Sequence, residues 1–163
     1  MKHLLLKLLL FSTVFMGSVA HANDTTIAIV VHPDTNVSDL SMDQLRKIFL
    51  ADQQFWPDKS RITLLVRAPK AADRDLVLNH IYLMSEAQFR QYWVAKMFRA
   101  EVTSGPKLVF SSTMALDLLM AIRGSIAFVN ASEINDKKFN DKIKILRING
   151  LLPSDAAYPL RSP

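Results

Sequence analysis

Apolar residues form two patterns along this chain, short unbroken runs and stripes at helical spacing. Runs of mainly apolar residues that are rich in β-branched side chains predict buried strands. Runs that are apolar throughout are typical of strands covered on both faces. The predicted strands are 26–31, 62–66, 107–110, 125–129 and 143–148.

A serine three positions ahead of a glutamine marks the start of two helices. Ser41 and Gln44 are spaced as a capping box, and so are Ser85 and Gln88. Apolar residues flank both boxes at the staple positions. We therefore expect one helix to begin after Ser41 and another to run from Ser85 to about Met97.

Two further helices are expected after predicted strands. Asp73 is expected to cap a helix over 74–84, and Ser111 or Ser112 to cap a helix through Ile122. Gly124 would terminate the second of these helices. Strands that alternate with helices predict an α/β layer structure with a mainly parallel sheet.

The first 22 residues have the features of an export signal. Lys2 precedes an apolar core at 8–16, and the small residues Ala20 and Ala22 end the segment. We expect cleavage after Ala22, a single domain over 23–163, and export to the periplasm. A membrane anchor is the alternative, but the apolar stretch is about half the roughly 20 residues that a spanning helix needs, and Lys7 interrupts it. The chain has no cysteine, so we expect neither a lipoprotein nor a disulfide.

The charge balance is mild. Residues 1–22 hold two of the 20 Lys and Arg and none of the 15 Asp and Glu, so the predicted mature chain has a net charge of +3. This balance slightly favours small anions and does not indicate a nucleic-acid partner.

Catalytic groups are sparse in the predicted mature chain. It has two histidines, His32 and His80, and no cysteine. His80 falls on an apolar helix, where a packed histidine is the ordinary interpretation, and His32 precedes a proline at a strand end. Neither a Gly-x-Ser-x-Gly elbow nor a His-Glu-x-x-His helix is present. We therefore predict no enzyme, no cofactor and no metal site.

Anion binding fits the helix starts better. In an α/β sheet, helices that follow strand ends line the usual ligand crevice, and their free N–H groups attract anions. The alternative is ordinary capping beside a solvated arginine. The candidate anion-binding residues follow the predicted strands 62–66 and 107–110 and are Arg67, Lys70, Arg74, Ser111, Ser112 and Thr113.

Four segments in order resemble the phosphate-binding proteins of ABC transporters. The stretch 40–49 with Phe55-Trp56 is similar to the family's L-T-x-x-Q-L-x-x-I-F…W, and 124–129 to its G-A-I-G-Y-V. The run 62–67 ends on Arg67, which matches the family's arginine. The segments 148–154 and 158–160 are similar to I-D-G-V-x-P-T…Y-P-L. The resemblance covers essentially the whole predicted mature chain.

The resemblance implies a three-layer α/β sandwich with a mainly parallel central sheet, equivalent to one lobe of a type II periplasmic binding protein. Full-length members have two such lobes. The family's Ser-Gly-Thr after the arginine is replaced here by Ala71-Ala72-Asp73. Two lost hydroxyl donors would cost roughly 1.5–3 kcal/mol each, and Asp73 adds a carboxylate where the anion would lie.

Two functions remain open from the sequence. The first is an exported solute-binding protein for phosphate or another small oxyanion, connected with ABC-type transport, with a permease or other envelope protein as partner and assembly from two copies. The second is a periplasmic interaction or sensor module that has lost anion binding.

Overall fold

A five-stranded sheet forms the centre of the protein in the computed structural model, which describes residues 25–134 and 142–162. The predicted signal peptide, 1–22, lies outside the described residues. The strand order is β4-β3-β5-β1-β6. The strands are β1 (Ile27–Val31), β3 (Thr63–Arg67), β4 (Lys107–Val109), β5 (Ser125–Asn130) and β6 (Lys144–Ile145).

Four of these five strands run in the same direction. β3 pairs in parallel with both β4 and β5, whereas β1 pairs antiparallel with β5 and β6. Only β1 is therefore reversed. This arrangement confirms the mainly parallel sheet that the sequence predicts.

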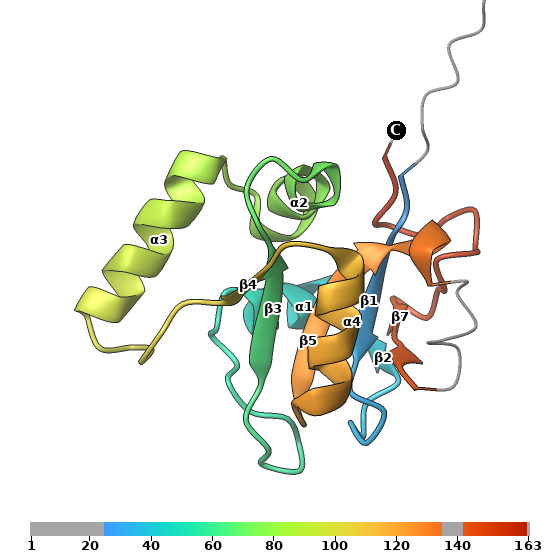
Figure 1. Cartoon of the computed structure of the whole chain (residues 1–163), viewed down its shortest axis with the longest axis horizontal. Coiled ribbons are helices and arrows are strands. Elements are labelled where there is room, and N and C mark those ends of the chain that lie inside the picture. Colours follow the sequence, from blue (N-terminus) through green and yellow to red (C-terminus); the bar gives the residue numbers. More distant parts are fainter. Residues whose placement is uncertain (1–24, 135–141, 163) are drawn as a thin grey trace, which may run out of the picture.

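Helices cover both faces of the sheet. Successive side chains of β1 point to opposite faces and all are apolar, so both faces must be buried. Ile27, Ile29 and Val31 pack into the core under the first three helices, and Ala28 and Val30 pack into the core under the fourth. In Figure 1, α4 crosses one face while α1 lies behind the strands. The helices are α1 (Met42–Phe49), α2 (Ala72–Val77), α3 (Glu86–Phe98) and α4 (Ser112–Ala121). The predicted three-layer sandwich is confirmed.

Both predicted capping boxes form. The Ser41 hydroxyl accepts from Gln44 N at 3.1 Å, and the Gln44 side chain accepts from Ser41 N at 2.9 Å. Ser85 and Gln88 make the same reciprocal pair at the start of α3. Ser111 is the residue that caps α4. These starts are encoded locally, within four residues.

The predicted helix over 74–84 is wrong in its cap and its length. Ala71 is the N-cap and offers no side-chain hydrogen bond, and Asp73 lies inside α2. The chain then widens into a π-helix, η1 (Leu78–Tyr82). Arg46 of α1 donates to the Ile81 carbonyl at 3.0 Å, so a side chain from another helix satisfies an acceptor of the π-helical turn.

The predicted strand over 143–148 is two short strands. After β6, Leu146 N still donates to Ile29 of β1, but Arg147 N donates to Ser38. The chain thereby leaves the central sheet, and β7 (Arg147–Ile148) pairs in parallel with β2 (Asp39–Leu40). The sequence did not predict β2, which has only two residues. None of the described helices has the length and apolar content that crossing a membrane requires.

Candidate functional site

The candidate anion-binding residues follow the carboxyl ends of β3 and β4, which are neighbours in the sheet. Arg67 ends β3 opposite Val109, and Ala68 N donates to the Val109 carbonyl at 2.9 Å. The chain therefore leaves both strands at the same end of the sheet, toward α2 and α4. Open α/β sheets place their ligands at the carboxyl ends of their strands, which is this end.

Arg67 is paired with a carboxylate from its own lobe. Its Nε lies 2.9 Å from Asp73 Oδ2, and both side chains are largely buried. The approach is off the line of the N–H bond, so the contact is an ion pair and not a hydrogen bond. Arg67 Nη1 is also buried, and it donates to no acceptor among the described residues. The guanidinium thus keeps buried donor capacity that no described residue uses.

Asp73 carries a perturbed carboxyl group. Burial raises the pKa of Asp73 above its ordinary value of 3.8 and outweighs the opposing effects of Arg67 and of the Arg74 N–H, which donates to Asp73 Oδ1 at 3.0 Å. The negative charge of Glu133, just beyond β5, raises this pKa further. The Arg67 guanidinium therefore faces a buried carboxyl group of α2.

Arg74 is engaged in packing α2 against α3. It is 2% exposed, its Nε and Nη2 donate to the two carboxylate oxygens of Glu86 at 2.9 and 3.1 Å, and its Nη1 donates to the Arg67 carbonyl. The guanidinium also lies 4.7 Å from the centre of the Phe89 ring. Each of the three nitrogens donates to a partner and the side chain is buried, so Arg74 is engaged in this packing contact and not turned toward a ligand.

The three hydroxyl residues at the start of α4 differ in what they contact. The Ser111 hydroxyl accepts from Met114 N at 3.0 Å and caps the helix. Ser112 is buried, and its hydroxyl has no hydrogen-bond partner in the described part of the chain. Thr113 is exposed. Ser112 is therefore the member of this group with unused buried hydrogen-bonding capacity.

Lys70 lies in the turn between β3 and α2. It is exposed, and its φ of 75° places it in the left-handed region. Within residues 25–134 and 142–162 it forms no ion pair. Its ammonium group is free to turn toward a bound anion.

The two histidines have local partners. His32 is buried, and its Nδ1 accepts from Asp34 N at 3.1 Å. His80 Nδ1 lies 3.0 Å from the Leu76 carbonyl, one helical turn back. No cluster of three or more His, Asp or Glu side chains among the described residues could hold a metal ion.

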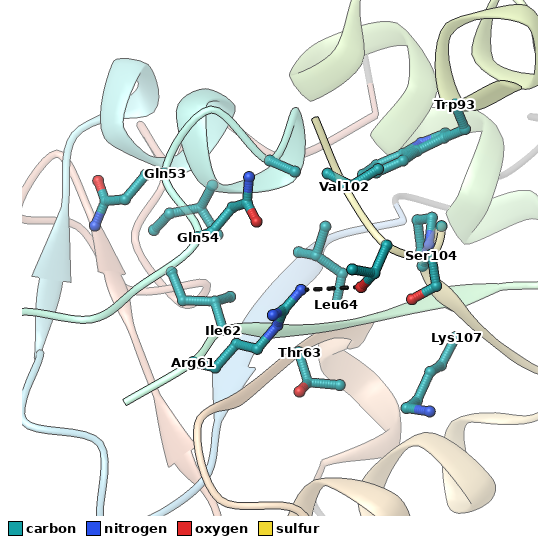
Figure 2. A pocket seen from close by; sticks show the side chains of 15 residues that line it. Gln53, Gln54, Arg61, Ile62, Thr63, Leu64, Trp93, Val102, Ser104 and Lys107 are labelled. Atoms are coloured by element: carbon teal, nitrogen blue, oxygen red, sulfur yellow. Dashed lines mark hydrogen bonds between the residues drawn. The ribbon is translucent and has the colours of Figure 1, made fainter. Parts of the chain in front are cut away.

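A pocket of about 180 Å³ lies at the opposite ends of β3 and β4, and none of the six candidate residues lines it. Figure 2 shows its side chains, which include Arg61, Trp93, Ser104 and Lys107. The sequence analysis missed this pocket. Its only sequence signal is a basic residue at or just before the start of each of the two strands.

Three solved structures share the fold. They are PstS from Borrelia burgdorferi (13% identity, TM-score 0.68), a phosphate ABC transporter substrate-binding protein from Clostridium perfringens with bound phosphate (16%, 0.67), and an ABC-type phosphate transport receptor from Vibrio cholerae (15%, 0.66). The matches cover 85%, 86% and 85% of this chain and 55%, 54% and 54% of those proteins, in the same order.

No family model matches the chain, and no curated protein does. The likeness is therefore one of fold. The chain spans about half the length of the solved structures that it matches. Its mainly parallel sheet with helices on both faces is the fold of phosphate-binding proteins of ABC transporters, over a length that corresponds to one lobe.

Proposed function

We propose that the protein is an exported solute-binding protein for a small oxyanion of the phosphate class. The observation that carries this proposal is a pair of buried donors without partners, near the carboxyl ends of β3 and β4. Arg67 Nη1 and the Ser112 hydroxyl are both buried without a hydrogen-bond partner among the described residues. Buried polar groups in folded proteins are nearly always satisfied, and a bound oxyanion would satisfy these two.

Asp73 narrows the class of anion. A carboxylate repels a fully ionised oxyanion, but it accepts a hydrogen bond from an oxyanion that still carries a proton. Phosphate keeps at least one proton near neutral pH, and sulfate keeps none. Burial raises the pKa of Asp73, which makes its carboxylate a better acceptor for the proton that phosphate still carries. We therefore expect phosphate to bind more tightly than sulfate.

The length of the chain bears on how such a site would be completed. The matches cover 54–55% of the solved phosphate-binding proteins, so nearly half of their structure has no counterpart in this chain. A second copy of this chain, or an ABC permease or other envelope protein, would supply the facing half. Export to the periplasm, proposed from residues 1–22, agrees with such a role.

Isothermal titration with phosphate and with sulfate at neutral pH tests the proposal. Phosphate should give saturable heat, and sulfate should bind at least tenfold more weakly. Arg67→Gln and Ser112→Ala should each weaken phosphate binding by about tenfold or more, since a hydrogen bond to a charged partner contributes roughly 1.5–3 kcal/mol. Arg90→Gln, at an exposed position on α3, is the matched control and should bind as the unchanged protein does.

The second candidate is an interaction module without a small ligand, and one observation favours it. Asp73 already neutralises Arg67, and Glu86 already neutralises Arg74. On this alternative, the folded protein gives no heat with millimolar phosphate. Asp73→Ser, which returns a hydroxyl to α2 and removes the repelling charge, would then create phosphate binding that the unchanged protein lacks.

A further inference from the structure

The pocket at the amino-terminal ends of β3 and β4 has a composition that suits a small organic ligand. Its floor is apolar, from Ile62, Leu64, Trp93 and Val102, each at most 8% exposed. Its rim is polar and comes from the loop before β3 and the loop before β4 (Figure 2). With about 180 Å³ the pocket is smaller than the sites of drug-sized ligands, so its ligand is small.

The charge of the pocket selects an anion. Arg61 and Lys107 line it, and no Asp or Glu does. Neither cation forms an ion pair with a described residue, and Arg61 makes one side-chain contact, from Nη2 to the Thr103 hydroxyl at 3.4 Å. Two uncompensated cations above an apolar floor match a molecule with a negative head and an apolar body.

Trp93 supplies a second, independent indication. It is 5% exposed, it lines the pocket, and its indole Nε1 has no acceptor in the described part of the chain. A buried indole N–H usually has a partner, so a missing one points to an acceptor outside the described residues. An oxygen atom of a bound anion is such an acceptor.

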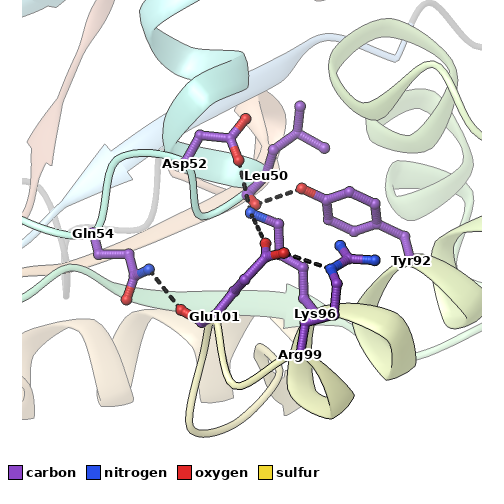
Figure 3. Close-up of polar contacts among 7 residues, drawn as sticks. All are labelled: Leu50, Asp52, Gln54, Tyr92, Lys96, Arg99 and Glu101. Atoms are coloured by element: carbon purple, nitrogen blue, oxygen red, sulfur yellow. Dashed lines mark hydrogen bonds and ion pairs between the residues drawn. The ribbon is translucent and has the colours of Figure 1, made fainter.

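Polar contacts behind the pocket hold its walls in place (Figure 3). Gln54 donates to the Glu101 carbonyl at 3.0 Å, which joins the loop before β3 to the loop before β4. The Tyr92 hydroxyl donates to the Leu50 carbonyl at 2.7 Å, which ties the end of α1 to α3. The pocket is therefore formed before a ligand arrives, which limits the entropy lost on binding.

Two acidic side chains in the loops beside the pocket are paired with cations other than Arg61 and Lys107. Lys96, buried on α3, donates to Asp52 at 2.6 Å and lies 3.5 Å from Glu101, and Arg99 pairs with Glu101. Burial alone would lower the pKa of Lys96, but its hydrogen bonds to Asp52 and Tyr92 outweigh this effect and raise that pKa. Lys96 thus stays charged and engages both carboxylates.

We propose that this pocket binds a small organic carboxylate, with the carboxylate held by Arg61 and Lys107 and accepting from the Trp93 indole N–H, and with a short apolar body on the floor. The site is separate from the oxyanion site, because Thr63 and Arg67 stand at opposite ends of β3, roughly 13 Å apart at the usual rise per residue. The proposal for this pocket does not depend on the function proposed for the oxyanion site.

Nuclear magnetic resonance of the two indole N–H groups tests this site. The chain has two tryptophans, and Trp56 donates its indole N–H to the Gly124 carbonyl, so its signal is an internal control. On titration with benzoate, the Trp93 signal should shift saturably and the Trp56 signal should stay in place. Benzyl alcohol, with the same ring and no charge, should bind about tenfold more weakly or worse.

Variants separate the two sites. Arg61→Gln and Lys107→Gln should each weaken benzoate binding several-fold, and Arg67→Gln should leave it unchanged. A Trp93 signal that does not move in tens of millimolar benzoate overturns the proposal. So do equal affinities for benzoate and benzyl alcohol, or a Trp93 shift with inorganic phosphate as large as with benzoate. Because the Arg61 and Lys107 side chains are exposed, the fold should persist in these two variants, and the remaining amide signals report this for all three.

Discussion

At the scale of single residues, Asp73 decides how the candidate oxyanion site behaves. The sequence places it correctly among the residues after Arg67 but assigns it the wrong task, that of a helix cap. Its carboxylate is instead 2.9 Å from the Arg67 guanidinium. A cap is a local signal, whereas this ion pair depends on how α2 packs against the end of β3. Sequence spacing could not reveal it.

The raised pKa of Asp73 gives a prediction for stability against pH. A carboxyl group whose pKa is higher in the folded than in the unfolded state binds more protons when folded, in the window that begins at its ordinary value of 3.8. The free energy of unfolding therefore gains from Asp73 as pH falls through the folded pKa, and loses this contribution as pH rises.

Urea unfolding between pH 4 and pH 7, with Asp73→Asn as the non-titrating reference, measures this contribution. The unchanged protein should gain stability relative to the variant as pH falls, by about 1.4 kcal/mol for each unit by which the pKa is raised. A relative loss at low pH would mean that Arg67 dominates and holds the pKa below its ordinary value.

At the scale of elements, the sequence predicts best what is encoded within a few residues. The capping boxes at Ser41 and Ser85 are predicted correctly because their donors and acceptors lie three positions apart. The π-helix after Val77 was not predicted, since Arg46 of another helix contacts its carbonyl groups. The division of 143–148 into two strands depends likewise on β2, more than 100 residues earlier in the chain.

In the connection from α4 to β5, the glycine that the sequence predicts as the helix end also makes a close tertiary contact. Gly124 has a φ of 75°, and a Cβ atom there would collide with the carbonyl oxygen of Arg61. Gly124→Ala should lower the free energy of unfolding by roughly 2–5 kcal/mol, combining about 1–2 kcal/mol for the left-handed backbone with about 1–3 kcal/mol for overpacking.

Two other glycines serve as controls in the same denaturant experiment. Gly150 has nearly the same φ, 77°, and open space around it, so Gly150→Ala should show only the backbone cost. Gly105 also has open space, and Gly105→Ala should be nearly neutral. If the changes at Gly124 and Gly150 cost the same, the contact with Arg61 contributes nothing.

At the scale of the whole molecule, the outer strand β4 and the residues that follow it expose apolar side chains to solvent. β4 is an outer strand of the sheet, and exposed apolar side chains lie on it, just after it and at the start of α4: Leu108 is 47% exposed, Phe110 73% and Met114 37%. The carboxyl end of this strand adjoins the candidate oxyanion site. Exposed apolar surface therefore lies beside the candidate oxyanion-binding residues, and such a surface often marks an interaction site.

Pairing of two copies through this edge would cover the apolar side chains and bring two candidate sites together. Two-fold assembly is the commonest way to bury such a surface. We expect Phe110→Glu to shift the protein from dimer to monomer in sedimentation equilibrium, because each dimer would then bury two uncompensated carboxylates. Phe98→Glu is the matched control, since Phe98 is 92% exposed on α3, a different element, and should leave the assembly unchanged.

The same pair of variants links assembly to ligand binding. If two copies complete the oxyanion site, Phe110→Glu should weaken phosphate binding together with dimerisation, while Phe98→Glu preserves both. A monomeric unchanged protein that still binds phosphate would show that one lobe suffices. In that case Arg67 and Ser112 hold the anion without a facing half, and the apolar edge has a different occupant.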